Sequence, residues 1–165
     1  MNTSIQSSGL LAEKIYKPYL QLQLGQNISA VLSMENTQEV FTVDSKRITP
    51  MPNMPECVIG LLNQRSRIFW VVNFPQMLGL PPVDINLQEY SLALIRANEI
   101  PLGLIVPSIK GVVRLVMEEV QSPVGNVAAG IVPYLQGCLL QKNSILLVLD
   151  PEAIINSSIL HSVSL

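Results

Sequence analysis

The side chains that usually carry enzyme chemistry are scarce in this sequence, and their spacing does not suit catalysis. The only histidine, His161, lies four residues before Leu165, so a catalytic triad or a histidine-rich metal site has nothing to use. The sequence contains no Walker loop and no G-x-S-x-G or G-x-G-x-x-G motif. We therefore predict a protein that is not an enzyme and that carries no metal and no cofactor.

The other candidate residues for chemistry have simpler structural interpretations. Asp150 ends an apolar run and precedes Pro151, which is typical of a helix N-cap rather than of a phosphoacceptor. The adjacent acids Glu118–Glu119 would face opposite sides of a strand, so we expect solvated charges. Cys57 and Cys138 share no close spacing, and we expect two free thiols that are small buried apolar residues in a reducing compartment.

A group of cations raises the question of nucleic-acid binding. Lys46, Arg47, Arg65 and Arg67 could cluster near the aromatic pair Phe69–Trp70. However, ten lysines and arginines against twelve acids leave a net charge of −2, so the chain has no basic field to hold a nucleic-acid backbone. The aromatic residues lie in apolar runs that are typical of core strands. We expect no nucleic-acid partner.

Length and composition indicate one globular domain, or two small halves that share a core. The chain has 165 residues, of which 48% are apolar and only 13% are charged, which excludes a disordered chain. Residues 120–141 carry no charge, but prolines, glycines and amides interrupt them too often for a membrane span. The N-terminus lacks the early positive charges and apolar core of a secretion signal. We expect a cytoplasmic protein that does not insert into a membrane.

Short strands separated by turn residues make up most of the chain from Tyr19 onward. Period-two alternation and apolar runs predict strands at residues 19–24, 28–32, 48–51, 67–74, 90–97 and 99–106. The short helical segments that we expect are 35–41, 53–60, 108–112 and one that begins after Asp150. Many short strands and few helices predict an all-β fold with short helices.

The two halves of the chain repeat each other. Residues 60–73 (GLLNQRSRIFWVVN) align without gaps on residues 137–150 (GCLLQKNSILLVLD) at an offset of 77, with glycine on glycine and cation on cation. The strands 68–72 and 145–149 are apolar on both faces, as expected when one face fills a barrel and the other packs on a neighbour. We predict two related β-barrel halves in which these strands are equivalent, at about residues 19–80 and 90–156.

A series of motifs resembles the CheW family. Residues 48–55 (ITPMPNMP) resemble its P-x-P-N-x-P-like lead, and residues 60–66 (GLLNQRS) resemble its G-V-x-N-x-R-G turn. Residues 68–74 (IFWVVNF) resemble its strand that ends V-V-D-L. Shorter matches are 37–41 (TQEVF), 78–80 (LGL), 104–106 (LIV), 133–137 (PYLQG) and 147–150 (LVLD). The resemblance covers nearly all of residues 19–156.

This resemblance implies a fold, a function and partners. The fold is a CheW-like domain at residues 18–156 with two five-stranded β-barrel subdomains, an N-terminal tail at 1–17 and a C-terminal tail at 157–165. Family members couple the cytoplasmic tips of chemoreceptors to the regulatory domain of a CheA-type histidine kinase, and they have no catalysis of their own. The tryptophan in IFWVVNF resembles members from cyanobacterial motility and phototaxis clusters.

Four residues are the candidate partner-binding residues: Arg65, Glu39, Val40 and Asn63. The resemblance places Arg65 near the receptor-facing groove, and Glu39 matches a glutamate that can pair with it. For Arg65, Val40 and Asn63, a structural role remains an alternative to partner binding. Arg65 could brace its own turn through backbone carbonyls, and Val40 with Phe41 could line a barrel. Asn63 could satisfy the turn backbone.

Three residues depart from the family pattern. Ser66 replaces the glycine after the arginine, Asn73 replaces the V-V-D aspartate, and Pro107 replaces the aspartate usual after a second-half strand. If the glycine position has a positive φ, Ser66 costs on the order of 1 kcal/mol. Trp70 is expected to be a core residue rather than a contact residue. The departures keep open an alternative function, a diverged CheW-fold scaffold or ligand-binding module without receptor coupling.

Overall fold

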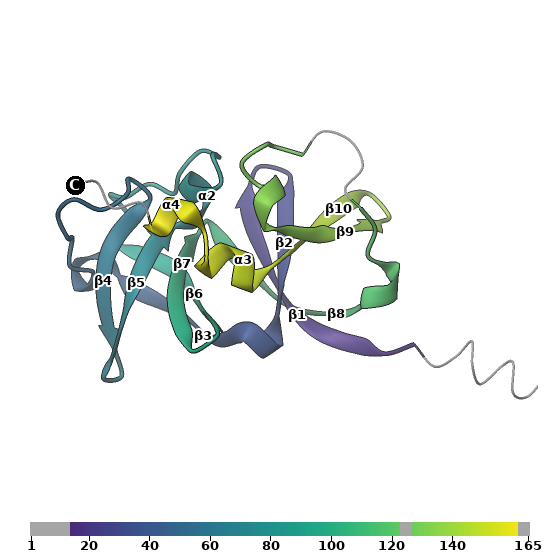
Figure 1. Ribbon diagram of the computed structural model, residues 1–165, viewed down its shortest axis with the longest axis horizontal. Coiled ribbons are helices and arrows are strands. Elements are labelled where there is room, and N and C mark those ends of the chain that lie inside the picture. Colours follow the sequence, from purple (N-terminus) through teal and green to yellow (C-terminus); the bar gives the residue numbers. More distant parts are fainter. Residues whose placement is uncertain (1–13, 123–126, 162–165) are drawn as a thin grey trace, which may run out of the picture.

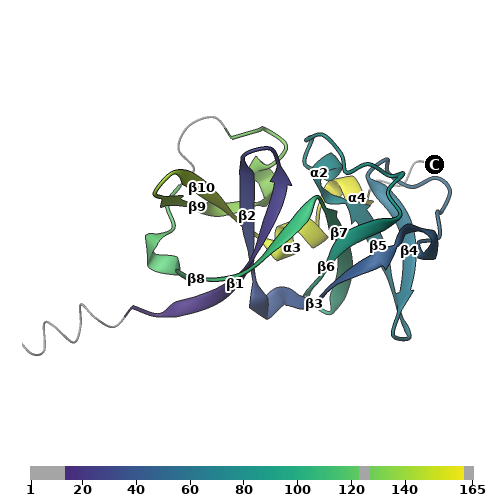
Figure 2. The ribbon, with the colours of Figure 1, turned by 180° about the vertical axis from the view of Figure 1, so that it is seen from behind.

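Ten strands and seven short helical segments form the described part of the chain, residues 14–122 and 127–161 of a computed structural model (Figures 1 and 2). The strands are β1 Tyr16–Gly25, β2 Ile28–Ser33, β3 Thr37–Asp44, β4 Val58–Gln64, β5 Arg67–Asn73, β6 Glu89–Ala97, β7 Ile100–Val106, β8 Ser108–Val116, β9 Leu135–Gln141 and β10 Ser144–Leu149. The helical segments are η1 Met34–Asn36, η2 Ser45–Arg47, α2 Phe74–Met77, η3 Met117–Glu119, η4 Val132–Tyr134, α3 Pro151–Ile155 and α4 Ser158–His161. The predicted all-β class with short helices is confirmed.

The strands form two five-stranded sheets with the same internal order. The central barrel has the order β3-β6-β7-β5-β4, and the terminal barrel has the order β8-β1-β2-β10-β9. In each sheet the fourth strand runs parallel to the third, so that Val72 on β5 lies beside Leu104 and Val148 on β10 lies beside Val31. The predicted equivalence of residues 68–72 and 145–149 is therefore confirmed.

The predicted boundaries of the two halves are wrong. Residues 19–80 and 90–156 do not each form a barrel, because β1 and β2 pair with β8, β9 and β10, while β3 to β7 form the other sheet. Each half of the chain gives its first two strands to one barrel and its last three to the other. Pro107 alone separates β7 from β8, and since proline has no backbone N–H to continue a ladder, the chain leaves the central barrel there.

One isolated β-bridge closes each barrel. Backbone N–H groups and carbonyls of Thr49 and Leu61 exchange hydrogen bonds of 2.8 and 2.9 Å, and those of Gln121 and Cys138 exchange two of 2.8 Å. A Cβ atom at Gly60 would overlap the carbonyl oxygen of Thr49. The glycine at the repeat-equivalent position, residue 137, meets Gln121 in the same way. Close approach of the backbone thus explains why the repeat has glycine on glycine.

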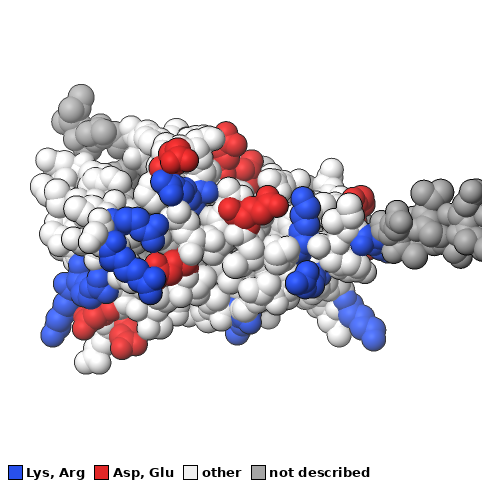
Figure 3. Space-filling model, turned by 90° about the horizontal axis from the view of Figure 1, so that it is seen from below, with Lys and Arg blue, Asp and Glu red and all other residues white. Residues whose placement is uncertain are grey.

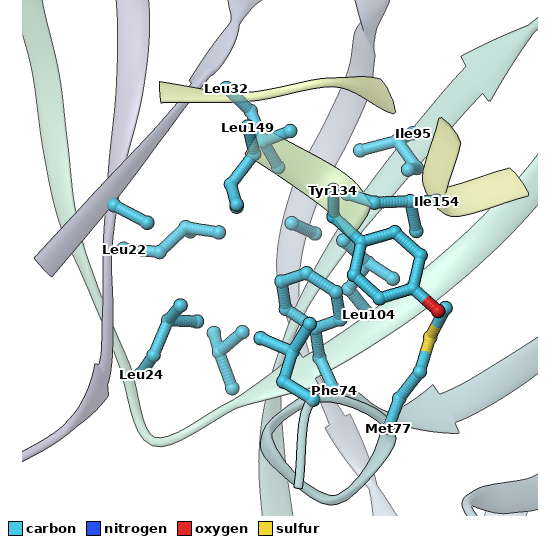
Figure 4. Close-up of a cluster of buried hydrophobic side chains, with 14 of the residues drawn as sticks. Leu22, Leu24, Leu32, Phe74, Met77, Ile95, Leu104, Tyr134, Leu149 and Ile154 are labelled. Carbon is cyan, nitrogen blue, oxygen red and sulfur yellow. The ribbon is translucent and has the colours of Figure 1, made fainter. Parts of the chain in front are cut away.

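Three clusters of buried apolar side chains hold the fold together. One fills the central barrel, one fills the terminal barrel, and the largest lies between the two barrels. Figure 4 shows this shared core, to which strands of both barrels and the helices α2 and α3 contribute. Trp70, predicted to be a core residue, is only half-buried: it packs against the shared core from outside and lines a hollow.

Four local predictions were wrong. The strand predicted at residues 48–51 is reduced to an isolated bridge between Thr49 and Leu61. No helix forms at residues 53–60, where Asn53 has a φ of 60° in a turn and β4 begins at Val58. Residues 108–112 belong to β8, whose pairing with β1 outweighs any local helical preference. The helical segment predicted at 35–41 is limited to η1, because residues 37–44 form β3 and pair with β6.

The predicted tails are shorter in the structure than in the sequence analysis. Tyr16 and Lys17 already belong to β1, and they pair with Val116 and Leu115 of β8. Residues 1–13 and 162–165 lie outside the described residues, and α4 occupies most of the remaining C-terminal segment. Among the described residues, no helix has both the length and the apolar character that crossing a membrane would need.

Candidate partner-binding surface

The β4–β5 hairpin places Arg65 at the tip of the central barrel. Gln64 and Arg67 are the last paired residues, so Arg65 and Ser66 form a two-residue turn. Their φ angles are 50° and 64°, and two positive φ angles in succession define a type I′ turn. Ser66 therefore occupies the left-handed conformation that favours glycine, as its position in the motif predicted. The turn keeps its shape without the glycine.

Glu39 on β3 holds two arginines of this hairpin. Its carboxylate oxygens lie 3.6 Å from Arg65 Nη2 and 3.6 Å from Arg67 Nη2. The Glu39 side chain is only 16% exposed, whereas that of Arg65 is 75% exposed. The predicted pairing of Arg65 with Glu39 is thus present in the structure, and Arg67 is a second partner that the motif comparison missed. The sequence feature that could have indicated this role is the grouping of Arg67 with the other cations considered in the sequence analysis.

The side-chain hydrogen bonds that stabilise the hairpin come from Arg47 and not from Arg65. Arg47 Nη2 donates to the backbone carbonyl of Asn63 at 2.7 Å and to Gln64 Oε1 at 2.9 Å. Arg65 donates no hydrogen bond to a carbonyl of any described residue. The side chain of Asn63 is exposed and has no hydrogen-bond partner within residues 14–122 and 127–161. The Arg65 guanidinium is therefore free to meet a partner on its exposed side, and Arg47 takes the bracing role.

An apolar groove begins beside Glu39 and runs between the two barrels. It has a volume of about 380 Å³, and its walls include Val40 of β3 and Val112 of β8. Both valines are exposed, whereas the neighbouring Phe41 packs against the core of the central barrel. Val40 is therefore a groove residue and Phe41 a barrel residue. The groove is apolar along most of its length. Glu39 in its lining pairs with Arg65 and Arg67, which do not line the groove themselves, and we call these three residues its charged end.

The polar residues that were considered for chemistry form hydrogen bonds that stabilise the local backbone. Asp150 Oδ1 accepts from the backbone N–H groups of Glu152 and Ala153 at 3.0 and 3.3 Å, so its predicted N-cap role is confirmed. The buried Asn73 amide donates to the carbonyl of Val83 at 2.9 Å and accepts from its N–H at 3.1 Å. Burial raises the pKa of the Cys57 thiol, which disfavours the reactive thiolate. In the described part of the chain, no group of three potential metal ligands occurs.

Figure 3 shows Lys and Arg side chains at both ends of the molecule; over the end that the central barrel forms, Asp and Glu side chains lie among them. The structure brings Arg47, Arg65 and Arg67 of the sequence cluster together at the hairpin, whereas Lys46 lines a hollow with Ile48 and Ile85.

Comparisons with known proteins agree with this architecture. The sequence matches the family model of the CheW-like domain over residues 18–158. It is 30% identical over 146 residues to the chemotaxis protein CheW of Treponema pallidum (strain Nichols), which covers 86% of this chain and 84% of that protein. It is 27% identical over 115 residues to the chemotaxis protein CheW of Thermotoga maritima, with coverages of 70% and 74%.

The fold is also similar to a solved structure. The crystal structure of the scaffolding protein TtCheW from Thermoanaerobacter tengcongensis matches with a TM-score of 0.70 and 18% identity, over 82% of this chain and 90% of that chain. This likeness concerns the fold, and the family model concerns the sequence. Because the family model spans most of the residues and a relative at 30% identity covers most of both chains, the chain belongs to the CheW-like domain family.

Proposed function

We propose that this protein is a non-enzymatic signalling adaptor that couples the cytoplasmic tip of a chemoreceptor to the regulatory domain of a CheA-type histidine kinase. It acts in the cytoplasm, at assemblies of receptor and kinase that serve chemotaxis, phototaxis or pilus motility. The observation that carries this proposal is the groove between the barrels, whose charged end presents Arg65 beside Glu39. An arginine with 75% of its side chain exposed can donate to several acceptors of a helical tip at once.

The receptor side uses the groove and its charged end. Val40 and Val112 supply apolar contact along the groove, and the exposed side of Arg65 supplies directional hydrogen bonds. Glu39 fixes the position of the guanidinium, because its largely buried carboxylate is held by two arginines. Asn63 lies two residues before Arg65 on β4 and extends the polar rim on the same hairpin.

The kinase side needs a separate surface, and the central barrel offers one at its opposite end. A hollow of about 420 Å³ lies there, lined in part by Ile48, Ile59 and Ile85. Ile85 is 64% exposed, and an exposed apolar residue beside an open hollow is typical of a contact surface for another protein. The two ends of one barrel thus carry two surfaces of different character.

The departures from the family pattern are compatible with this function. Ser66 keeps the turn that presents Arg65, and Asn73 performs a buried structural task that needs no charge. Pro107 lies at the crossing between the barrels, away from the hairpin. None of the three replaces a side chain of the groove or of its charged end.

Calorimetric titration tests the proposal. The full-length protein is titrated with the regulatory domain of the CheA-type kinase and, separately, with a receptor cytoplasmic fragment, and then with one partner in the presence of the other. The adaptor proposal expects binding to each and simultaneous binding of both. Binding to neither partner, or competition between them for one surface, contradicts it.

A further inference from the structure

A second hollow lies at the mouth of the central barrel, on the hairpin side of the molecule. It has a volume of about 210 Å³, and its floor includes Phe69 and Leu94, which both belong to the core of that barrel. Its rim carries Gln38 and the arginines Arg67 and Arg96. Barrel mouths with an apolar floor and a few polar groups on the rim are a common kind of binding site.

The two arginines on the rim are weakly neutralised by their own neighbours. Arg67 lies 3.6 Å from Glu39 Oε1 and donates to Gln38 Oε1 at 3.1 Å, but it shares that glutamate with a second arginine. Arg96 Nη2 lies 3.3 Å from Glu99, whose side chain is 92% exposed. An ion pair this exposed to water contributes little, so a carboxylate from another molecule can replace it.

Arg96 also has an unsatisfied donor. Its Nε atom is buried and has no hydrogen-bond partner among the described residues. A buried N–H without an acceptor is unfavourable, and a carboxylate seated at the rim would bring acceptor oxygens to this guanidinium. Among the described residues, Arg65 and Arg67 pair with one carboxylate, that of Glu39, Arg96 pairs with Glu99, and Arg47 bonds to a carbonyl and an amide oxygen instead. The charge of this surface therefore favours an acidic occupant.

An exposed apolar residue adjoins the same hollow. Ile68 lines it and is 64% exposed, although it lies in a strand whose next residue is core. The surface thus combines paired cations with an apolar contact. The hollow is smaller than the roughly 300 Å³ or more of a typical drug-sized ligand site, and the charged surface continues past it to Arg65. These dimensions suit a side chain of a protein segment better than a free small molecule.

We propose that the mouth of the central barrel binds an acidic segment of a partner protein, with one carboxylate between Arg67 and Arg96 and a neighbouring apolar side chain on Ile68. This goes beyond the adaptor proposal, whose receptor contact lies in the groove and at Arg65, and the two sites adjoin at Gln38 and Arg67. Nucleic acid and anionic membrane are disfavoured as occupants, since the net charge of the chain is −2 and the cations form one small cluster.

Nuclear magnetic resonance provides the test, with the full-length protein and a synthetic peptide of sequence ELEELE, capped at both ends. The peptide in which glutamine replaces every glutamate is the matched probe. We expect the acidic peptide to shift the side-chain N–H signals of Arg67 and Arg96 and the methyl signals of Ile68. Arg67→Gln and Arg96→Gln should each weaken binding at least about fivefold, the lower end of the effect of losing hydrogen bonds between charged groups.

The control is Arg114→Gln, which removes an exposed arginine of β8 on the other barrel and should leave the affinity unchanged. Arg96→Lys keeps the charge and should retain part of the binding, and melting temperatures check that each variant is folded. Equal losses in Arg114→Gln, or equal binding of the glutamine peptide, would overturn the proposal. Equal affinity for free glutarate, or stronger shifts with phosphatidylserine vesicles or single-stranded DNA, would overturn it in favour of another occupant.

The outcome of the peptide experiment can be distinguished from the outcome of the test of the adaptor proposal. Binding of the kinase domain and the receptor fragment is measured on the wild-type protein without the peptide. Loss of peptide binding leaves those two affinities as they were, and failure of either partner to bind leaves the peptide result standing.

Discussion

Replacing Arg65 with glutamate distinguishes two roles for this residue: contact with a partner protein, or structural support of its own turn. The substitution reverses one charge at a turn position with a φ of 50°, where both side chains meet the same backbone strain. It leaves Glu39 with Arg67 as its remaining cation, at 3.6 Å. We expect weaker receptor binding, an intact fold and nearly unchanged kinase binding.

The expected effect on stability is small because of where the ion pair lies. The Arg65 side chain is 75% exposed, and exposed ion pairs contribute about 0–1 kcal/mol. Two unit charges about 4 Å apart in water interact by only about 1 kcal/mol, so repulsion between the new carboxylate and Glu39 is of the same size. The free energy of unfolding should therefore fall by no more than about 2 kcal/mol.

The expected effect on receptor binding is larger, because hydrogen bonds from a charged group are lost in a contact that excludes water. Such bonds contribute about 1–3 kcal/mol, which corresponds to roughly a fivefold to 150-fold increase in the dissociation constant. Kinase binding uses the opposite end of the barrel in our proposal and should change by less than about twofold.

Lys142→Glu is the matched control, because the repeat places Lys142 in the equivalent turn of the β9–β10 hairpin. It makes the same change of charge on the terminal barrel. Calorimetric titration of both variants against both partners, together with urea unfolding, gives all the required quantities. Equal weakening by the two variants would show that only net charge matters. Equal weakening of binding to both partners, with a lower free energy of unfolding, would show that Arg65 is a structural brace.

Three further predictions concern stability and are measured by urea unfolding. Ser66→Gly should raise the free energy of unfolding by about 0.5–1 kcal/mol, since Ser66 has a φ of 64°; a loss would mean that the serine side chain supports the turn. Gly60→Ala should lower it by about 2–3 kcal/mol through overlap with the carbonyl of Thr49, whereas Gly25→Ala, with its nearest contact at 3.7 Å, should cost much less. Asp150→Ala should cost about 1 kcal/mol through loss of the N-cap, and phosphate incorporation that disappears in this variant would contradict the structural role.

Features with a local cause could be predicted from the sequence. The N-cap at Asp150 depends only on the next three residues, and the hairpin strands depend on apolar runs with turn residues between them. The internal repeat correctly identified β5 and β10 as equivalent strands. The repeat was visible because Gly60 and Gly137 are both required where the backbone of another segment approaches closely. The pair of Arg65 and Glu39 came from the family resemblance and not from any local pattern.

Features that depend on distant pairing could not be predicted. Residues 108–112 have no strong local preference and become a strand because β1 lies beside them. The pairing of Arg67 with Glu39 joins β5 to β3, which are not neighbours in the sheet order, so neither spacing nor periodicity reveals it. The exchange of strands between the halves is invisible for the same reason, since a repeat shows which strands are equivalent but not which ones pair.

The exchange of strands bears directly on the proposed binding of two partners. The groove has one wall on β3 of the central barrel and another on β8 of the terminal barrel. Domains joined by a simple linker usually move relative to each other unless their interface is large and apolar. Here the chain crosses between the barrels after β2 and again at Pro107, and the shared core buries side chains from both, such as Leu22 and Leu104 (Figure 4). Opening the groove would expose that core, so the groove and the hollow at the far end of the central barrel stay at a fixed separation.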